Sequence, residues 1–146
     1  VRYRPDWIVQ DNPFADDDPI VLLPAIRPNV ALFHAPLADT DGNVWVGIRR
    51  ELMTMAHAAE STLVTVEEIV SDSLLADERT AAGVIPSMYI HGVSVVEKGA
   101  WPVGLWGCYA ADHDHLQDYV RRAIAMEGFN EYLSAYGHES AAASTP

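Results

Sequence analysis

The chain has 146 residues, of which 49% are hydrophobic and 21% charged, which is typical of one globular domain with a buried core. Its net charge of −12 and its single lysine, Lys98, argue against a nucleic-acid partner, because phosphates attract clustered Lys and Arg. No apolar run approaches the ~20 residues of a membrane span, no signal peptide is visible, and the lone Cys108 cannot form an internal disulfide. We therefore expect a cytoplasmic protein without a membrane partner.

Residues 1–19 show little hydrophobic periodicity and end in three consecutive aspartates. We interpret this segment as an exposed connector, because runs of carboxylates usually form solvated loops. The apolar run over residues 20–23, enclosed by two prolines, predicts a short strand.

The apolar run over residues 30–33 is typical of a strand buried on both faces in a parallel sheet. His34 follows this run, and Asp39, Asp41, Gly42 and Asn43 then form a predicted tight turn. Asx side chains close turns on their own backbone, so turn formation alone accounts for Asp39 and Asn43. The alternative is that this turn lines a crevice that binds a ligand.

A helix is predicted over residues 50–60, because Leu52, Met55, Ala56 and Ala59 form one apolar stripe. The next buried strand is predicted over residues 63–66, followed by Glu67 and Glu68. In a parallel sheet the carboxyl ends of strands lie on the same edge, where ligands gather.

We therefore expect His34, Glu67 and the turn of residues 39–43 to lie near one another, and we take His34, Asp39, Asn43 and Glu67 as candidate substrate-binding residues. For His34 alone, a hydrogen bond to a loop carbonyl is the simpler interpretation. Glu67 has a structural alternative as well, which is pairing with an arginine across an interface.

Residues 88–96 predict a strand at the sheet edge, and the aromatic loop of residues 101–109 predicts a cover over the core or a subunit contact. Asp112 suits a helix N-cap, and His113 and His115 make a poor metal chelate, because residues two apart point to different sides of a helix. Two amphipathic helical stripes follow, ending at Gly128 and at Gly137. Together, alternating strands and helices predict an α/β fold with an open, mainly parallel sheet flanked by helices.

The order of four segments across the chain resembles one known family. DNPF, RPNVALFHAPLADTDGN, LVTVEEIV and GAWPVGLWGCYAADHDHLQDYV follow one another as in the A (alpha) subunit of family I coenzyme A transferases, particularly the glutaconate CoA-transferase branch. The resemblance extends from Asp11 to about Gly137 and matches the C-terminal half of such a subunit. It implies a partial CoA-transferase-like sheet over residues 20–137, with residues 1–19 as the connector between two halves of the subunit. The Ala/Ser-rich composition of residues 138–146 predicts a flexible tail.

The resemblance also implies a function, the movement of CoA between carboxylic acids through a glutamyl thioester. The nucleophilic glutamate of the family belongs to the B subunit, in a Ser-Glu-Asn-Gly motif, and this chain contains no Ser-Glu dipeptide. The Gly-Gly-Phe loop of A subunits is absent too, since no two of the 9 glycines are adjacent. We therefore expect no catalytic residue here and no activity from the chain alone. The expected ligand is acyl-CoA without a metal, and the expected partners are the missing N-terminal half and a B subunit.

Two alternatives stay open. One is a subunit of a CoA-ester hydrolase related to ring opening in steroid catabolism. The other is a non-catalytic scaffold or truncated interaction domain, which the absence of both family signatures allows.

Overall fold

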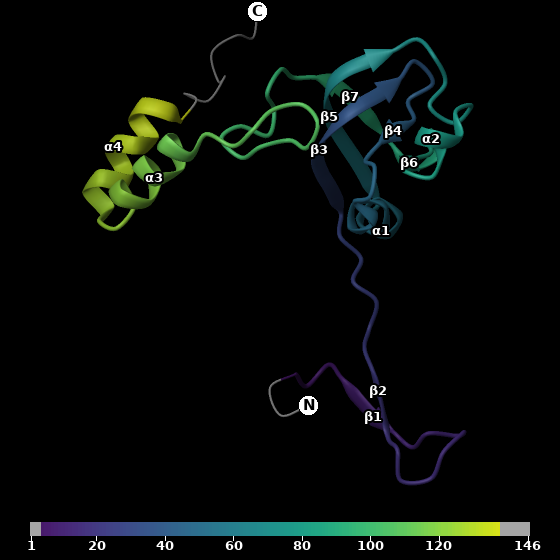
Figure 1. The fold of residues 1–146 in the computed structure, drawn as a ribbon. Coiled ribbons are helices and arrows are strands. Elements are labelled where there is room, and N and C mark those ends of the chain that lie inside the picture. The colour runs from purple at the N-terminus through teal and green to yellow at the C-terminus, as the bar shows by residue number, and fades with distance from the viewer. Residues whose placement is uncertain (1–3, 138–146) are drawn as a thin grey trace, which may run out of the picture.

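The computed structural model describes residues 4–137, so the flexible tail predicted over residues 138–146 lies outside the described residues. The chain begins with a small antiparallel hairpin of strands β1 (Ile8–Gln10) and β2 (Ile20–Leu22), which lies apart from the main sheet in Figure 1. The strand expected over residues 20–23 is thus present, but it pairs with a strand inside the segment interpreted from the sequence as a connector. All residues of both strands are exposed.

The main sheet has five strands in the order β6-β4-β3-β5-β7. The central pair β3 (Val30–Asp39) and β5 (Ser61–Val70) is parallel, and β7 (Gly92–Val95) adds to β5 in parallel at one edge. The short strands β4 (Val44–Trp45) and β6 (Val84–Ile85) extend the other side in antiparallel pairs. The fold is therefore α/β with a mixed, mainly parallel sheet, as the sequence predicted.

The two central strands are longer than the sequence predicted. Each has 10 residues, and their register pairs His34 with Thr65 and Leu37 with Glu68. His34 and Glu67 therefore lie within strands, and the prediction that each follows a strand end is wrong. An apolar run marks the buried part of a strand, whereas the strand itself continues as long as its backbone groups find partners.

Helix α1 (Arg50–Ala58) connects β3–β4 to β5 and covers one face of the sheet (Figure 1). Its Ala56 is buried in the core, and Leu52 and Met53 pack against the same core. The small side chain of Ala56 lets the helix approach the strand closely, and the hydroxyl of buried Thr62 donates to its carbonyl at 3.4 Å. The core consists of small and β-branched residues: Ala35, Ala38, Val44, Val46, Ala56, Val64, Val66 and Ile85.

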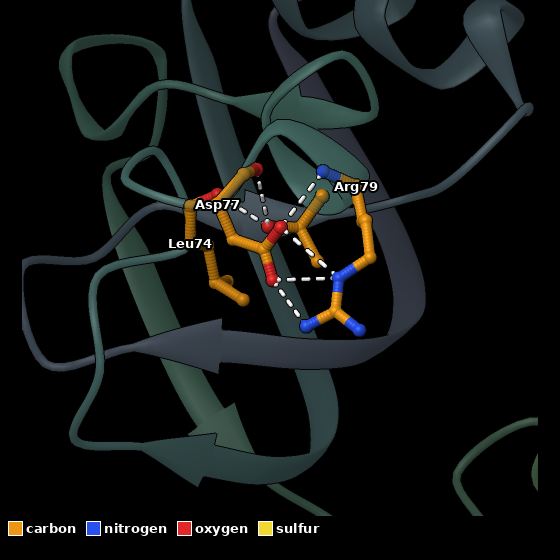
Figure 2. Close-up of polar contacts among 4 residues, drawn as sticks. Leu74, Asp77 and Arg79 are labelled. Carbon is orange, nitrogen blue, oxygen red and sulfur yellow. Dashed lines mark hydrogen bonds and ion pairs between the residues drawn. The ribbon is translucent and has the colours of Figure 1, made fainter.

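The connection from β5 to β6 contains one short helix, α2 (Glu78–Ala81), which is fixed by local polar contacts (Figure 2). Asp77 caps the helix by accepting the Arg79 backbone N–H at 2.9 Å and also pairs with the Arg79 guanidinium. The Thr80 hydroxyl donates to the Leu74 carbonyl at 2.7 Å. A single 3₁₀ turn (Ser87–Tyr89) then leads toward β7.

The chain ends in two helices, α3 (His113–Arg122) and α4 (Met126–Tyr136), which pack against each other to one side of the sheet (Figure 1). Asp112 caps α3 as predicted, accepting the His115 backbone N–H at 2.9 Å. Buried His115 joins the helices through its Nε2, which lies 2.7 Å from the Tyr132 hydroxyl. Gly128, predicted to end the first helix, instead lies inside α4. Within residues 4–137, no helix is both long enough and apolar enough to span a bilayer.

Candidate functional site

The candidate site begins with a histidine and a glutamate on adjacent parallel strands. His34 on β3 places its Nε2 2.6 Å from Glu67 Oε1, and its Nδ1 lies 2.8 Å from the Thr65 hydroxyl. Thr65 and Glu67 are two apart on β5, so their side chains stand on the same face of the sheet. His34 and Glu67 are both largely shielded from solvent, with 8% of the His34 side chain and 17% of the Glu67 side chain exposed.

Glu67 is ionised in this arrangement. Burial alone would raise its pKa, but hydrogen bonds from the Lys98 backbone N–H, from His34 and from Tyr109 outweigh burial, so the net pKa is lowered. A carboxylate can only accept hydrogen bonds, so His34 Nε2 bears a proton and donates it to Glu67. Both ring nitrogens of His34 are therefore engaged inside the protein.

One face of this arrangement borders an apolar cavity of about 210 Å³. This is smaller than the ~300–1,000 Å³ of pockets that enclose drug-sized ligands, so the cavity fits a small acid or the end of a larger ligand. Arg49 and His34 are its ionisable lining residues. The complete lining is His34, Ala35, Pro36, Trp45, Val46, Gly47, Ile48, Arg49, Leu52, Leu105 and Trp106.

Sequence reasoning missed two of the segments that line the cavity. The first contains Trp45 and Arg49 and turns at Gly47, which has a positive φ of 62°. The second contains Leu105 and Trp106, in the aromatic loop expected to cover the core or contact another subunit. The available signals were Gly47, which allows a sharp change of direction before the helix, and the two large apolar residues beside glycines.

The turn of residues 39–43 is placed differently from His34 and Glu67. Asp39 and Asn43 are buried, at 3% and 4% exposure, and neither lines the cavity. Asp39 Oδ1 accepts the backbone N–H groups of Asp41 and Asn43, and its Oδ2 accepts the Asn43 side-chain amide at 2.9 Å. Asn43 Oδ1 accepts the Ser87 N–H at 2.9 Å. These bonds account for both polar side chains within the fold.

The pKa of Asp39 reflects the same bonds. Its burial raises the pKa, but the hydrogen bonds from Asn43, Leu74 and Asp41 more than compensate, so the net pKa lies below its usual value. Asp39 is thus an ionised, internally bonded group. The structure brings His34 and Glu67 together, as predicted, and leaves the turn outside the cavity that His34 lines.

The other reactive side chains considered in the sequence do not form a site in the described part of the chain. Burial and the negative charge of Glu67 raise the pKa of the Cys108 thiol, which disfavours the thiolate that nucleophilic chemistry needs. Between residues 4 and 137, no three His, Cys, Asp or Glu side chains are grouped closely enough to hold a metal ion.

Comparison with known proteins finds relatives among the A subunits of CoA-transferases. No family model matches the chain. It is 33% identical over 127 residues to the A subunit of glutaconate CoA-transferase from Acidaminococcus fermentans, a match spanning 86% of this chain and 39% of the relative. It is 34% identical over 128 residues to the A subunit of 3-oxoadipate CoA-transferase from Pseudomonas knackmussii, spanning 85% of this chain and 43% of that relative.

Solved structures agree with these relatives. Glutaconate coenzyme A-transferase from Acidaminococcus fermentans matches with a TM-score of 0.80 and 31% identity, over 90% of this chain and 41% of that one. A variant of the decarboxylase AibA/AibB matches with a TM-score of 0.73 and 29% identity, over 91% of this chain and 48% of that one.

The predicted resemblance is confirmed: the chain is similar to the C-terminal part of CoA-transferase A subunits and has their α/β fold. It spans about two fifths of the length of the two CoA-transferase chains that it matches.

Proposed function

We propose that this chain is the C-terminal part of the A subunit of a heteromeric, cytoplasmic CoA-transferase that moves CoA between carboxylic acids. The observation that carries the proposal is the 33–34% identity to the A subunits of two CoA-transferases over about 85% of this chain. The proposed partners are the N-terminal part of the A subunit, together with a B subunit, and the ligand is acyl-CoA without a metal.

The chemistry of such an enzyme requires a nucleophile that this chain does not supply. A glutamate of the B subunit would attack the acyl-CoA carbonyl, forming an acyl-glutamyl anhydride and releasing the CoA thiolate. The thiolate would then attack the glutamyl carbonyl, giving a glutamyl-CoA thioester and free carboxylate, and a second acid would reverse both steps. Splitting the exchange in this way is nucleophilic catalysis.

In this scheme the described cavity would hold the acyl part of the substrate. His34 and Arg49 supply the ionisable groups of an otherwise apolar wall, and Glu67 fixes the His34 ring from behind. For Asp39 and Asn43, direct contact with substrate remains a prediction. Their internal bonds support an indirect role, in which they hold the turn that leads into Trp45 on the cavity wall.

The test is reconstitution of the chain with the rest of its A subunit, in the presence of a B subunit, followed by measurement of CoA transfer between carboxylic acids. We expect transfer by the assembly and none by the chain alone. His34→Gln should lower kcat/KM in the assembly, whereas His113→Gln, at an exposed position on α3, should not. Full activity of both variants would contradict the proposed cavity.

A second candidate reaction follows from the similarity to a decarboxylase at a TM-score of 0.73. The two reactions differ in what is released, so carbon dioxide should be measured beside CoA transfer in the same assay. Carbon dioxide release without CoA transfer would replace the transferase proposal.

A separate test concerns the nucleophile. Turnover by the chain alone that is lost in Glu67→Gln or Glu68→Gln would overturn the assignment of the nucleophile to the B subunit.

A further inference from the structure

The two carboxylate oxygens of Glu67 bind different parts of the molecule. Oε1 accepts the proton of His34 on the neighbouring strand, at 2.6 Å. Oε2 accepts the backbone N–H of Lys98 at 2.9 Å, in the segment that follows β7. We call residues 98–109 the strap. Glu67 therefore links the strand that forms the inner wall of the cavity to the start of the strap.

The strap is a bonded unit that folds back on itself. The Ala100 N–H donates to the Tyr109 hydroxyl at 2.9 Å, and the Leu105 N–H donates to the Tyr109 carbonyl at 3.0 Å. Tyr109 also contributes to the lowered pKa of Glu67. The first residue of the strap, Lys98, has a φ of 52°, a conformation that costs a non-glycine residue energy and needs outside support.

The strap also fits closely against His34. A Cβ atom placed on Gly99 would lie 2.5 Å from His34 Nδ1, so only glycine lets the strap pass the imidazole at this distance. Farther along, buried Leu105 and exposed Trp106 line the same cavity as His34. The outer wall of the cavity thus depends on a segment whose beginning is fixed at Glu67 and His34.

We propose that Glu67 is a positioning residue that sets the cavity's shape, by holding the strap, and therefore Leu105 and Trp106, against the His34 side of the sheet. Any effect of the cavity's shape on substrate selection rests on the function proposed above. The positioning of the strap by Glu67 is independent of that function and can be measured without substrate.

Hydrogen exchange by mass spectrometry in the full chain, in the assembly in which it purifies, tests the positioning. Glu67→Ala removes both acceptors, so we expect the amides of Lys98, Ala100 and Leu105 to exchange roughly tenfold faster or more, the size expected for losing hydrogen bonds to a charged group. Gly99→Ala should have the same effect with the carboxylate intact. The matched control is Glu68→Ala, an exposed neighbour on the same strand, which should leave strap exchange unchanged.

Exchange elsewhere separates a local effect from a loss of the fold. Amides of α3, such as that of Ala123 at its C-cap, should keep their wild-type rates. Strap rates equal to wild type in Glu67→Ala, an increase confined to Lys98, or an equal increase in Glu68→Ala would each overturn the proposal.

The position of the proton on the His34 ring provides a second readout. It uses Glu67→Gln, so the proposal can still be tested if Glu67→Ala does not fold. In Glu67→Gln the amide oxygen can still accept from Lys98, but the amide nitrogen can only donate to His34. The His34 proton should therefore move from Nε2 to Nδ1, where it can be donated to the Thr65 hydroxyl. Ring ¹⁵N shifts, assigned with His34→Gln, should show this change of tautomer while strap exchange stays near wild type. If the amide flips instead, its oxygen accepts from His34, the tautomer stays unchanged and strap exchange rises, because the Lys98 N–H loses its acceptor. An unchanged tautomer together with wild-type strap exchange would contradict the proposed contacts of Glu67.

These readouts are independent of CoA chemistry. A strap released in Glu67→Ala, in an assembly with no transferase activity, would support the positioning and count against the proposed function. An active assembly in which strap exchange is unchanged by Glu67→Ala would support the proposed function and contradict the positioning.

Discussion

The carboxylate of Asp39 accepts the backbone N–H of Leu74 at 3.0 Å, across 35 positions of sequence. This bond ties the connection after β5 to the turn between β3 and β4, and it is buried. The Leu74 N–H is the fourth donor to the Asp39 carboxylate, after the backbone N–H groups of Asp41 and Asn43 and the side-chain amide of Asn43. Asp39 is thus the point at which three segments of the chain are joined.

Asp39→Asn should destabilise the protein, because an amide side chain cannot accept all four donors and brings a donor of its own. Leaving a buried donor without a partner costs about 1–3 kcal/mol, so we expect a loss of about 2 kcal/mol or more in the free energy of unfolding. Urea unfolding measures this loss. Asp41→Asn, at the exposed neighbouring position, is the control and should change stability little; equal effects of the two changes would remove the special role of Asp39.

Stability should fall steeply in acid, because Asp39 and Glu67 both have lowered pKa values in the folded chain. A lowered folded pKa contributes stability above the unfolded value, which is 3.8 for Asp and 4.5 for Glu, and this contribution is lost as pH falls through the folded pKa. We therefore expect constant urea midpoints near neutral pH and a decline that starts at about pH 4.5. In Asp39→Asn the decline should be shallower, and identical pH profiles would contradict this assignment.

Gly83→Ala should disturb the cavity wall from outside the cavity. A Cβ on Gly83 would lie 2.7 Å from the Gly47 carbonyl oxygen, and the Gly83 carbonyl accepts the Val46 N–H at 2.8 Å. Since backbone atoms cannot move away as a flexible side chain can, we expect a loss of about 1–3 kcal/mol, together with faster exchange of the Val46 amide.

Gly107→Ala is the comparison for that variant. Gly107 has a positive φ of 79°, and no atom lies within 4 Å of a Cβ added there. Gly107→Ala should therefore lower the free energy of unfolding through backbone strain alone, by about 1 kcal/mol. A larger loss in Gly107→Ala than in Gly83→Ala would show that contact with Gly47 is unimportant.

The hairpin of β1 and β2 predicts association. Its paired residues Val9 and Val21 are 54% and 45% exposed, and a two-stranded hairpin alone is at best marginally stable in water. In the assembly proposed above, the N-terminal part of the A subunit or the B subunit would cover this hairpin, and we expect the chain alone to behave poorly in solution. Val9→Glu should weaken assembly by sedimentation, whereas Gln10→Glu on the same strand should not. A monodisperse, cooperatively unfolding monomer of the wild-type chain would contradict this expectation.

The sequence predicted the parts of the fold that depend on local pattern. The apolar run before His34, the turn at Gly42 and the capping by Asp112 each follow from a few neighbouring residues, and all three are present. Strand length was not predictable in the same way, because β3 and β5 continue beyond their apolar residues through backbone pairing with each other.

The candidate site was predictable only where two adjacent strands define it. His34 and Glu67 meet because β3 and β5 are neighbours, although both residues lie within their strands. Trp106 and Ile48 come to the same cavity from loops far apart in the sequence, and no short pattern indicates that convergence. The bond from Leu74 to Asp39 likewise depends on the path of a long connection.

The register of β3 and β5 has a consequence for the order in which the chain folds. Every pair from Val30 and Ser61 to Asp39 and Val70 joins residues 31 apart, with only the turn, β4 and α1 between them. Closing this loop costs little more entropy than closing a shorter one, and it gains the longest ladder among the strands of residues 4–137. We therefore expect the segment from Val30 to Val70 to form early in folding and to contain the slowest exchanging amides, with later segments adding to it afterwards.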